Sequence, residues 1–126
     1  MSKQVKELPV IWLQGSTCSG CSVSVLNAVH PSPRNILIDQ LVPGVHLNLK
    51  FQATLMAGQG DPVIEVMENT AKAQKGEYVF VMEGSVSTAA NGAYAAIGER
   101  GGQPVSVATR VEELARDCMA VIALGT

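Results

Sequence analysis

Short apolar runs alternate with helix-length segments in this sequence, and that order limits the chain to few folds. The apolar runs are residues 10–13, 78–82 and 119–124. Between these runs lie segments whose apolar residues recur at helical spacing. They are residues 22–29, a shorter stretch near residues 35–41, a segment from Asp61 onwards and residues 107–117. Parallel neighbouring strands need crossovers of this length, so we expect an α/β domain. Its sheet should be doubly wound and mostly parallel, with helices on both faces, and all 126 residues should form a single domain.

The apolar positions also predict which side chains face the core. The helix at residues 22–29 has the stripe Val23, Leu26 and Val29. The next long helix, capped by Asp61 with Pro62 at its first position, has an inner face of Val63, Val66, Met67, Thr70 and Ala71. The last helix has Val107, Val111, Leu114 and Cys118 on one face. The run at 119–124 is predicted to be a buried strand, whereas residues 87–102 fit no element clearly.

Residues 46–51 alternate in a way that is typical of a strand with one exposed face. Leu47, Leu49 and Phe51 are predicted to face one way, with polar residues between them. Such a pattern indicates a half-exposed strand at an edge of the sheet. The prediction therefore places this segment beside, and not within, the centre of the sheet.

Composition excludes several classes of function. Hydrophobic residues make up 47% of the chain and charged residues 16%, which is too apolar for a disordered segment. The net charge is −2 and no basic stripe is present, so nucleic acid is not an expected partner. No apolar run approaches the roughly 20 residues that a membrane span needs. The polar start, residues 1–9, carries no export signal, which predicts a cytoplasmic location, or a periplasmic one if the start has been processed.

Residues with useful chemistry follow the predicted strands. Cys18 and Cys21 come after the first strand, Glu83 after a central strand and Thr126 after the last. Because sites in open α/β sheets gather at the carboxyl ends of the strands, we expect these positions to meet at one edge. Glu83 then either lies near a bound group or a partner, or is a solvated carboxylate at a strand end.

The pair Cys18–Cys21 has a C-x-x-C spacing that brings both sulfurs to one side of a turn. Gly20 keeps side-chain bulk out of the turn, and a helix that starts at the second cysteine favours a thiolate there. The spacing alone leaves three interpretations open, which are a metal or cluster site, a thioredoxin-like dithiol, and two ordinary half-buried thiols. Cys118 lies on an apolar helix face, where a free cysteine is usually a small core residue.

Residues 10–28, VIWLQGSTCSGCSVSVLNA, resemble the opening signature of [NiFe]-hydrogenase small subunits. The similarity continues through Met56-Ala57-Gly58, Glu83-Gly84-Ser85-Val86 and the closing AVIALGT. It implies a flavodoxin-like domain docked on a large subunit that holds the nickel–iron centre. Electrons would pass through a proximal [4Fe–4S] cluster, for which Cys18 and Cys21 look like two ligands. Gly20 stands where some oxygen-tolerant relatives have an extra cysteine, which implies an ordinary cluster.

The sequence departs from the family in the number of its cysteines. A four-iron cluster of this kind takes four thiolates, and the family's third ligand follows a Gly-Thr like Gly125-Thr126. The chain therefore looks like a fragment of a longer subunit or a short homologue, and we expect a partner chain, a separate segment or a non-protein ligand to complete the cluster. Gln52-Ala53 also replaces the family's usual His-Pro.

Three functions remain as predictions. The first is an electron-transfer subunit of a hydrogenase, an oxidoreductase whose chemistry at dihydrogen belongs to the large subunit, so that this chain has no catalytic residue of its own. The second is a stand-alone thioredoxin-like thiol oxidoreductase. The third is a cluster-free interaction module for a large subunit.

Overall fold

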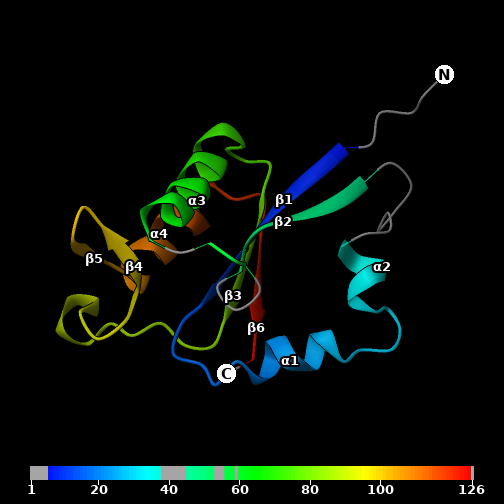
Figure 1. The fold of residues 1–126 in the computed structure, drawn as a ribbon, viewed down its shortest axis with the longest axis horizontal. Coiled ribbons are helices and arrows are strands. Elements are labelled where there is room, and N and C mark those ends of the chain that lie inside the picture. Colours follow the sequence, from blue (N-terminus) through cyan, green and yellow to red (C-terminus); the bar gives the residue numbers. More distant parts are fainter. Residues whose placement is uncertain (1–5, 38–44, 53–55, 59, 126) are drawn as a thin grey trace.

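A computed structural model describes residues 6–37, 45–52, 56–58 and 60–125 (Figure 1). Its elements follow in the order β1 (Lys6–Gln14), α1 (Gly20–Leu26), α2 (Pro33–Leu37), β2 (Val45–Gln52), α3 (Asp61–Ala73), β3 (Val79–Glu83), the 3₁₀ helix η1 (Ala89–Gly92), β4 (Ala96–Arg100), β5 (Gln103–Ser106), α4 (Val107–Asp117) and β6 (Ala120–Leu124). The predicted helix at residues 35–41 begins earlier, as α2, and its second half lies outside the described residues.

The main sheet has four parallel strands in the order β2-β1-β3-β6. β3 lies inside the sheet and is buried along its whole length, as its continuous apolar run predicted. β2 is an edge strand, which is also as predicted. Figure 1 shows α1 and α2 on one face of this sheet and α3 and α4 on the other. The predicted doubly wound α/β fold is thereby confirmed.

The last strand differs from its prediction. β6 was expected to be buried, but all of its residues are exposed or partly exposed, and Val121 and Ile122 each keep 50% of their surface open to solvent. The reason is its place in the sheet, because β6 pairs with β3 on one side and has no partner on the other among the described residues.

A separate hydrophobic core lies on each face of the sheet. On the α3 and α4 face it contains Ile11, Leu13, Phe51, Ile64, Met67, Tyr78, Phe80, Met82, Val107 and Leu114. On the α1 and α2 face a smaller core centres on Val10, Val79 and Val81. An apolar cavity of about 300 Å³ remains there between the sheet and the two short helices. The α3 and α4 face thus buries the larger set of apolar side chains.

β2 carries a bulge that changes its predicted facing. Leu49 pairs with Val10, but Phe51 pairs with the next residue of β1, Ile11, so the register shifts by one position at Lys50. The shift turns Phe51 into the core under α3 and α4, while Leu47 and Leu49 pack on the opposite face. The prediction that all three share one face was therefore wrong for Phe51.

The helix faces were predicted with mixed success. Residues Val107 and Leu114 of α4 are buried and its bounds are those predicted. In α3 the buried residues are Ile64 and Met67, whereas Val66 is 43% exposed. That helix is capped by Gly60, with a φ of 75°, and Asp61 is its first residue and not its cap.

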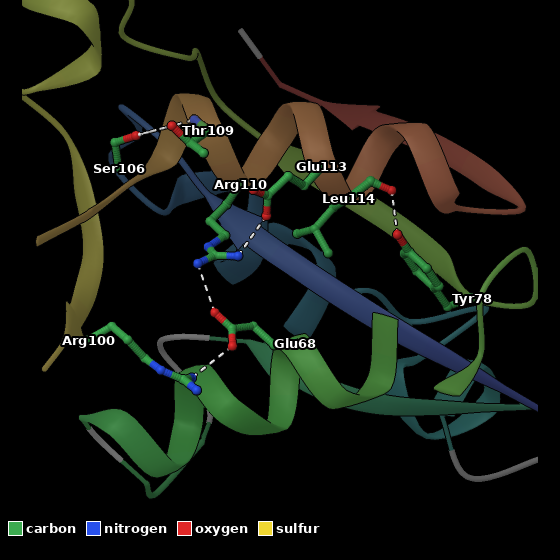
Figure 2. A network of polar contacts seen from close by, with 8 residues as sticks. All are labelled: Glu68, Tyr78, Arg100, Ser106, Thr109, Arg110, Glu113 and Leu114. Atoms are coloured by element: carbon green, nitrogen blue, oxygen red, sulfur yellow. Dashed lines mark hydrogen bonds and ion pairs between the residues drawn. The ribbon is translucent and has the colours of Figure 1, made fainter. Parts of the chain in front are cut away.

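The ambiguous stretch at residues 87–102 contributes to an antiparallel hairpin, β4–β5, that stands apart from the main sheet (Figure 1). Gly101 and Gly102 form its turn with φ values of 58° and 80°, which glycine adopts without strain. Figure 2 shows how the hairpin is tied down, since Arg100 pairs with Glu68 of α3 at 2.8 Å. Glu68 also pairs with Arg110 of α4 at 2.8 Å, so one carboxylate joins three elements.

Candidate functional site

The loops that leave β1 and β3 are fastened to each other at the carboxyl edge of the sheet. The amide of Gly15 donates to the Glu83 carbonyl at 3.0 Å, and the amide of Ser16 donates to the Ser85 carbonyl at 2.8 Å. A Cβ atom at Gly84 would lie 2.6 Å from the Cβ of Thr17. Glycine is therefore needed there for the two loops to approach. This junction fixes the start of the loop that carries the cysteines.

Both cysteines of the C-x-x-C pair are free thiols on the turn into α1. Cys18 is exposed, and Cys21, the second residue of the helix, is half-buried. Between them Ser19 adopts a left-handed φ of 64°, which makes the turn tight. A Cβ atom at Gly20 would lie 3.1 Å from the Cys18 sulfur. The absence of a side chain at Gly20 thus leaves that sulfur room, in line with the sequence interpretation.

The sulfur of Cys21 lies against the backbone that leaves β6. A Cβ atom at Gly125 would come within 2.5 Å of this sulfur, and Gly125 has a φ of 74°. The expected meeting of the first turn with the end of the last strand is therefore found. Thr126 itself lies outside the described residues.

Glu83 joins this group, but as a buried residue. Its side chain is 0% exposed, and both carboxylate oxygens accept hydrogen bonds. The amide of Ser22 donates to Oε1 at 3.0 Å, while the Ser22 hydroxyl donates to Oε2 at 2.6 Å. Trp12 Nε1 and Gln14 Nε2 each donate to Oε2 at 3.1 Å. A solvated strand-end carboxylate, one of the two sequence interpretations, does not fit this environment.

The hydrogen bonds decide the ionisation of Glu83. Burial raises the pKa of its carboxyl group, but the hydrogen bonds from Ser22, Gln14 and Trp12 outweigh burial and hold the pKa below its usual range. The carboxylate is therefore charged at neutral pH. The Ser22 amide that donates to this carboxylate belongs to the residue directly after Cys21.

Sequence reasoning missed most members of this polar network. Gln52, at the end of β2, is buried and donates to the Ser22 hydroxyl at 3.0 Å, and Gln14 donates to the same oxygen at 3.2 Å. A usable signal was present for two of them. Trp12 and Gln14 are two residues apart near the end of β1, so their side chains project from the same face of the strand. Ser22 gave no signal, since the predicted inner stripe of its helix was Val23, Leu26 and Val29.

Cys118 is kept apart from the other two cysteines. It precedes β6, at the end of that strand opposite Gly125, and packs against the core under α4. Its thiol donates to the Ala115 carbonyl at 3.3 Å, and burial together with the charge of Asp117 raises its pKa. No group of three or more metal-ligating side chains occurs in the described ranges. The predicted core role of Cys118 agrees with this placement.

Comparison with known proteins identifies the family. The sequence profile described as "NADH ubiquinone oxidoreductase, 20 Kd subunit" matches residues 18–126. The chain belongs to this family. Among curated proteins, it is 37% identical over its whole length to the periplasmic [NiFeSe] hydrogenase small subunit of Desulfomicrobium baculatum. It is 31% identical over 94% of its length to the hydrogenase-2 small chain of Escherichia coli K12.

Solved structures agree with the curated relatives. The recombinant [NiFeSe] hydrogenase from Desulfovibrio vulgaris Hildenborough has a chain that matches 98% of this one with a TM-score of 0.85 and 37% identity. The predicted resemblance to hydrogenase small subunits and the flavodoxin-like fold class are thereby confirmed. The chain spans 40% of the D. baculatum subunit and 41% of the D. vulgaris chain.

The site can be compared with what an iron–sulfur cluster requires. A [4Fe–4S] cluster takes thiolate ligands, and Cys18 and Cys21 present two thiols on one turn, with no side chain at Gly20 and Gly125 to crowd them. The donor chemistry therefore fits two of the four positions around such a cluster. The described part of the chain offers no third donor at this place.

Proposed function

We propose that this chain is the electron-transfer part of a hydrogenase small subunit. It carries electrons between the nickel–iron site of a large subunit and an acceptor, through a proximal [4Fe–4S] cluster bound in part by Cys18 and Cys21. The cluster supplies one-electron redox chemistry, and this chain supplies two thiolates and the turn that orients them. The reaction with dihydrogen takes place on the large subunit, which is also a proposed partner.

One observation carries this proposal, namely the contact between the Cys21 sulfur and the Gly125 backbone. The family resemblance places a third cluster ligand directly after a Gly-Thr pair such as Gly125-Thr126. A ligand that follows Thr126, or that a partner supplies at the same place, comes to the same side of the sheet as Cys21. Four thiolates can then converge around one cluster at the carboxyl edge of the sheet.

The competing functions have weaker support. A thioredoxin-like dithiol accounts for Cys18 and Cys21, but not for a likeness to hydrogenase subunits that covers the whole chain. The family description itself names a subunit of NADH–ubiquinone oxidoreductase, and an electron-transfer role there is the second candidate. That profile begins at residue 18, whereas the hydrogenase relatives also match the strand that precedes the cysteines. This additional match favours the hydrogenase.

The cellular compartment is part of the proposal. No helix in the described ranges is long and apolar enough to cross a membrane. The D. baculatum relative is named as periplasmic, which favours the periplasmic alternative over the cytoplasmic location expected from the first residues.

The test is metal analysis of the chain purified without air together with its large subunit. Iron, sulfide and the visible spectrum are measured for the wild type and for Cys18→Ser, Cys21→Ser and Cys118→Ser. The proposal predicts iron and sulfide in the wild type and in Cys118→Ser, and a loss of both in the other two variants. A tight complex without iron supports the interaction module, and a reversible Cys18–Cys21 disulfide with reductase activity supports the thioredoxin-like alternative.

A further inference from the structure

The most deeply buried residue of helix α1 is polar, while Val25 and Leu26 line the apolar cavity beside the sheet. The predicted apolar stripe of the helix is exposed, with Val23 at 54%, Leu26 at 45% and Val29 at 91% of full exposure. The residue that the helix buries is Ser22, which lies in the Glu83 network. The prediction of an inner face of valine and leucine was therefore wrong. A hydroxyl group takes the inward position because the buried carboxylate lies directly opposite.

The start of α1 also lacks a cap from its own sequence. Ser19 is the N-cap residue, and its side chain makes no capping hydrogen bond. The amides of the first turn have no partner within a helix and need an acceptor. Glu83, which is 61 residues away in the sequence, accepts from one of them, the Ser22 amide, at 3.0 Å. It thus takes the role that an N-cap side chain usually has.

Cys21 directly precedes Ser22 in the sequence. The hydrogen bond from the Ser22 amide to Glu83 therefore restrains the backbone of the turn that carries the Cys21 side chain. We propose that Glu83 is the positioning residue of the C-x-x-C turn, and that its carboxylate holds Ser22 so that the Cys21 sulfur stays against Gly125. This inference rests on the proposed function for its meaning, because the turn so held is the one that receives the cluster.

The charge of Glu83 has a second consequence for a cluster on this turn. Net charge and outer-shell hydrogen bonds influence the reduction potential of an iron–sulfur cluster and how tightly the protein binds it. A fixed negative charge disfavours the reduced form, which is the more negative one, and so lowers the midpoint potential. Removal of the charge therefore raises the potential. A residue that only supports the fold has no such effect.

The first experiment needs no cluster. Alkylation of Cys18 and Cys21 by iodoacetamide is followed separately by peptide mass spectrometry in the wild-type chain, Glu83→Gln and Ser22→Ala. The exposed residue Glu65 of α3 provides the control Glu65→Gln. In Glu83→Gln an amide nitrogen faces the Trp12, Gln14 and Ser22 donors. In this variant we expect Cys21 to react about tenfold faster, while the rate for Cys18 changes little. The effect should be smaller in Ser22→Ala, because the backbone amide of residue 22 can still donate to Glu83.

The second experiment uses the complex with the large subunit. The midpoint potential of its proximal cluster and the rate of iron release to a chelator are measured for the wild type, Glu83→Gln and Glu65→Gln. We expect a higher potential and about tenfold faster iron release in Glu83→Gln alone. Circular dichroism shows whether each variant is folded. If Glu83→Gln does not fold, the same measurements are made on Ser22→Ala.

The outcomes separate this inference from the proposed function. A wild-type complex without iron overturns the proposed function, while the alkylation rates still report whether Glu83 holds the turn. Equal Cys21 alkylation rates in folded Glu83→Gln and wild type overturn the positioning role, whatever the iron content. An unchanged midpoint potential overturns the role of the charge.

Discussion

At the scale of single residues, two features define the site, a buried carboxylate and a glycine that touches a sulfur. Glu83 accepts hydrogen bonds from donors of β1 and α1. Gly125 has no Cβ atom, and this leaves room for the Cys21 sulfur. Both contacts join residues that are far apart in the sequence. The C-x-x-C turn is therefore shaped by the end of two other strands, and not by its local sequence alone.

Gly125→Ala tests the contact with the sulfur, and Gly76→Ala is its matched control. Both glycines have a positive φ, 74° and 76°, so each substitution should cost about 1 kcal/mol of stability through backbone strain. Only at Gly125 does the new Cβ meet the Cys21 sulfur, because nothing lies within 4 Å of a Cβ at Gly76. We expect both variants to lose similar stability in urea, and only Gly125→Ala to change the alkylation rate of Cys21.

At the scale of elements, the core under α3 and α4 and the hairpin depend on a few cross-links between helices and strands. Tyr78, directly before β3, donates its hydroxyl hydrogen to the carbonyl of Leu114 in α4 at 2.5 Å (Figure 2). Glu68 of α3 binds Arg100 of the hairpin and Arg110 of α4. These contacts hold the α3, α4 and hairpin layer together on the face of the sheet opposite α1.

Tyr78 predicts a loss of stability in alkaline solution. Burial, with smaller contributions from the charges of Cys118 and Asp117, raises the pKa of its hydroxyl group from 10.0 to about 12. The folded protein therefore keeps this proton longer than the unfolded chain does, and stability that is complete below pH 10 declines between pH 10 and 12. Unfolding followed by Trp12 fluorescence should show this decline in the wild type. It should be smaller in Tyr78→Phe, and equal slopes for both proteins would contradict the assignment.

The ion pairs predict unequal effects for two neighbouring glutamates. Glu68 is 15% exposed and pairs with two arginines, so Glu68→Gln leaves Arg110 partly buried with less compensation and should cost about 1–3 kcal/mol. Glu113 is 50% exposed and pairs with Arg110 within α4, so Glu113→Gln should cost only about 0.5 kcal/mol. Urea unfolding measures both. Similar losses in the two variants would show that the network does not anchor the hairpin.

The sequence predicted the elements of this fold better than their faces. The strands around residues 10–13 and 78–82 and the helix at 107–117 were found because each has a long apolar run or a clear helical period. The bulge at Lys50, the exposed face of α1 and the open edge of β6 were not, since each depends on a contact between distant segments. The pair Gly101-Gly102 is a hairpin signal in the sequence that was not included in the prediction for residues 87–102.

The same limit applies to the site. The rule that parallel strands end at one edge was enough to bring Cys21, Glu83 and the end of β6 together. It gave no information on whether Glu83 would be solvated or buried, because its partners Trp12 and Ser22 are 71 and 61 residues away in the sequence. Positions were thus predictable from topology, whereas roles depended on side-chain packing.

At the scale of the whole molecule, the chain is an α/β domain whose site is open at one edge. The two thiols, the Gly125 backbone and the exposed strand β6 all lie at or beside that edge. The domain spans less than half of the relatives it resembles, so the proposed cluster needs further protein around it. In the proposed function, electron transfer is a property of the whole assembly, and the part proposed for this chain is to supply two ligands and the turn that supports them.

The most direct measurement is the response of the air-free complex with the large subunit to hydrogen gas. If Cys18 and Cys21 hold a cluster that accepts electrons from the nickel–iron site, the broad visible absorption of that cluster should bleach under hydrogen in the wild type and in Cys118→Ser. Cys18→Ser and Cys21→Ser should show no such change. An equal bleaching in all four proteins, or no iron in any of them, would contradict the assignment of this turn as the electron relay.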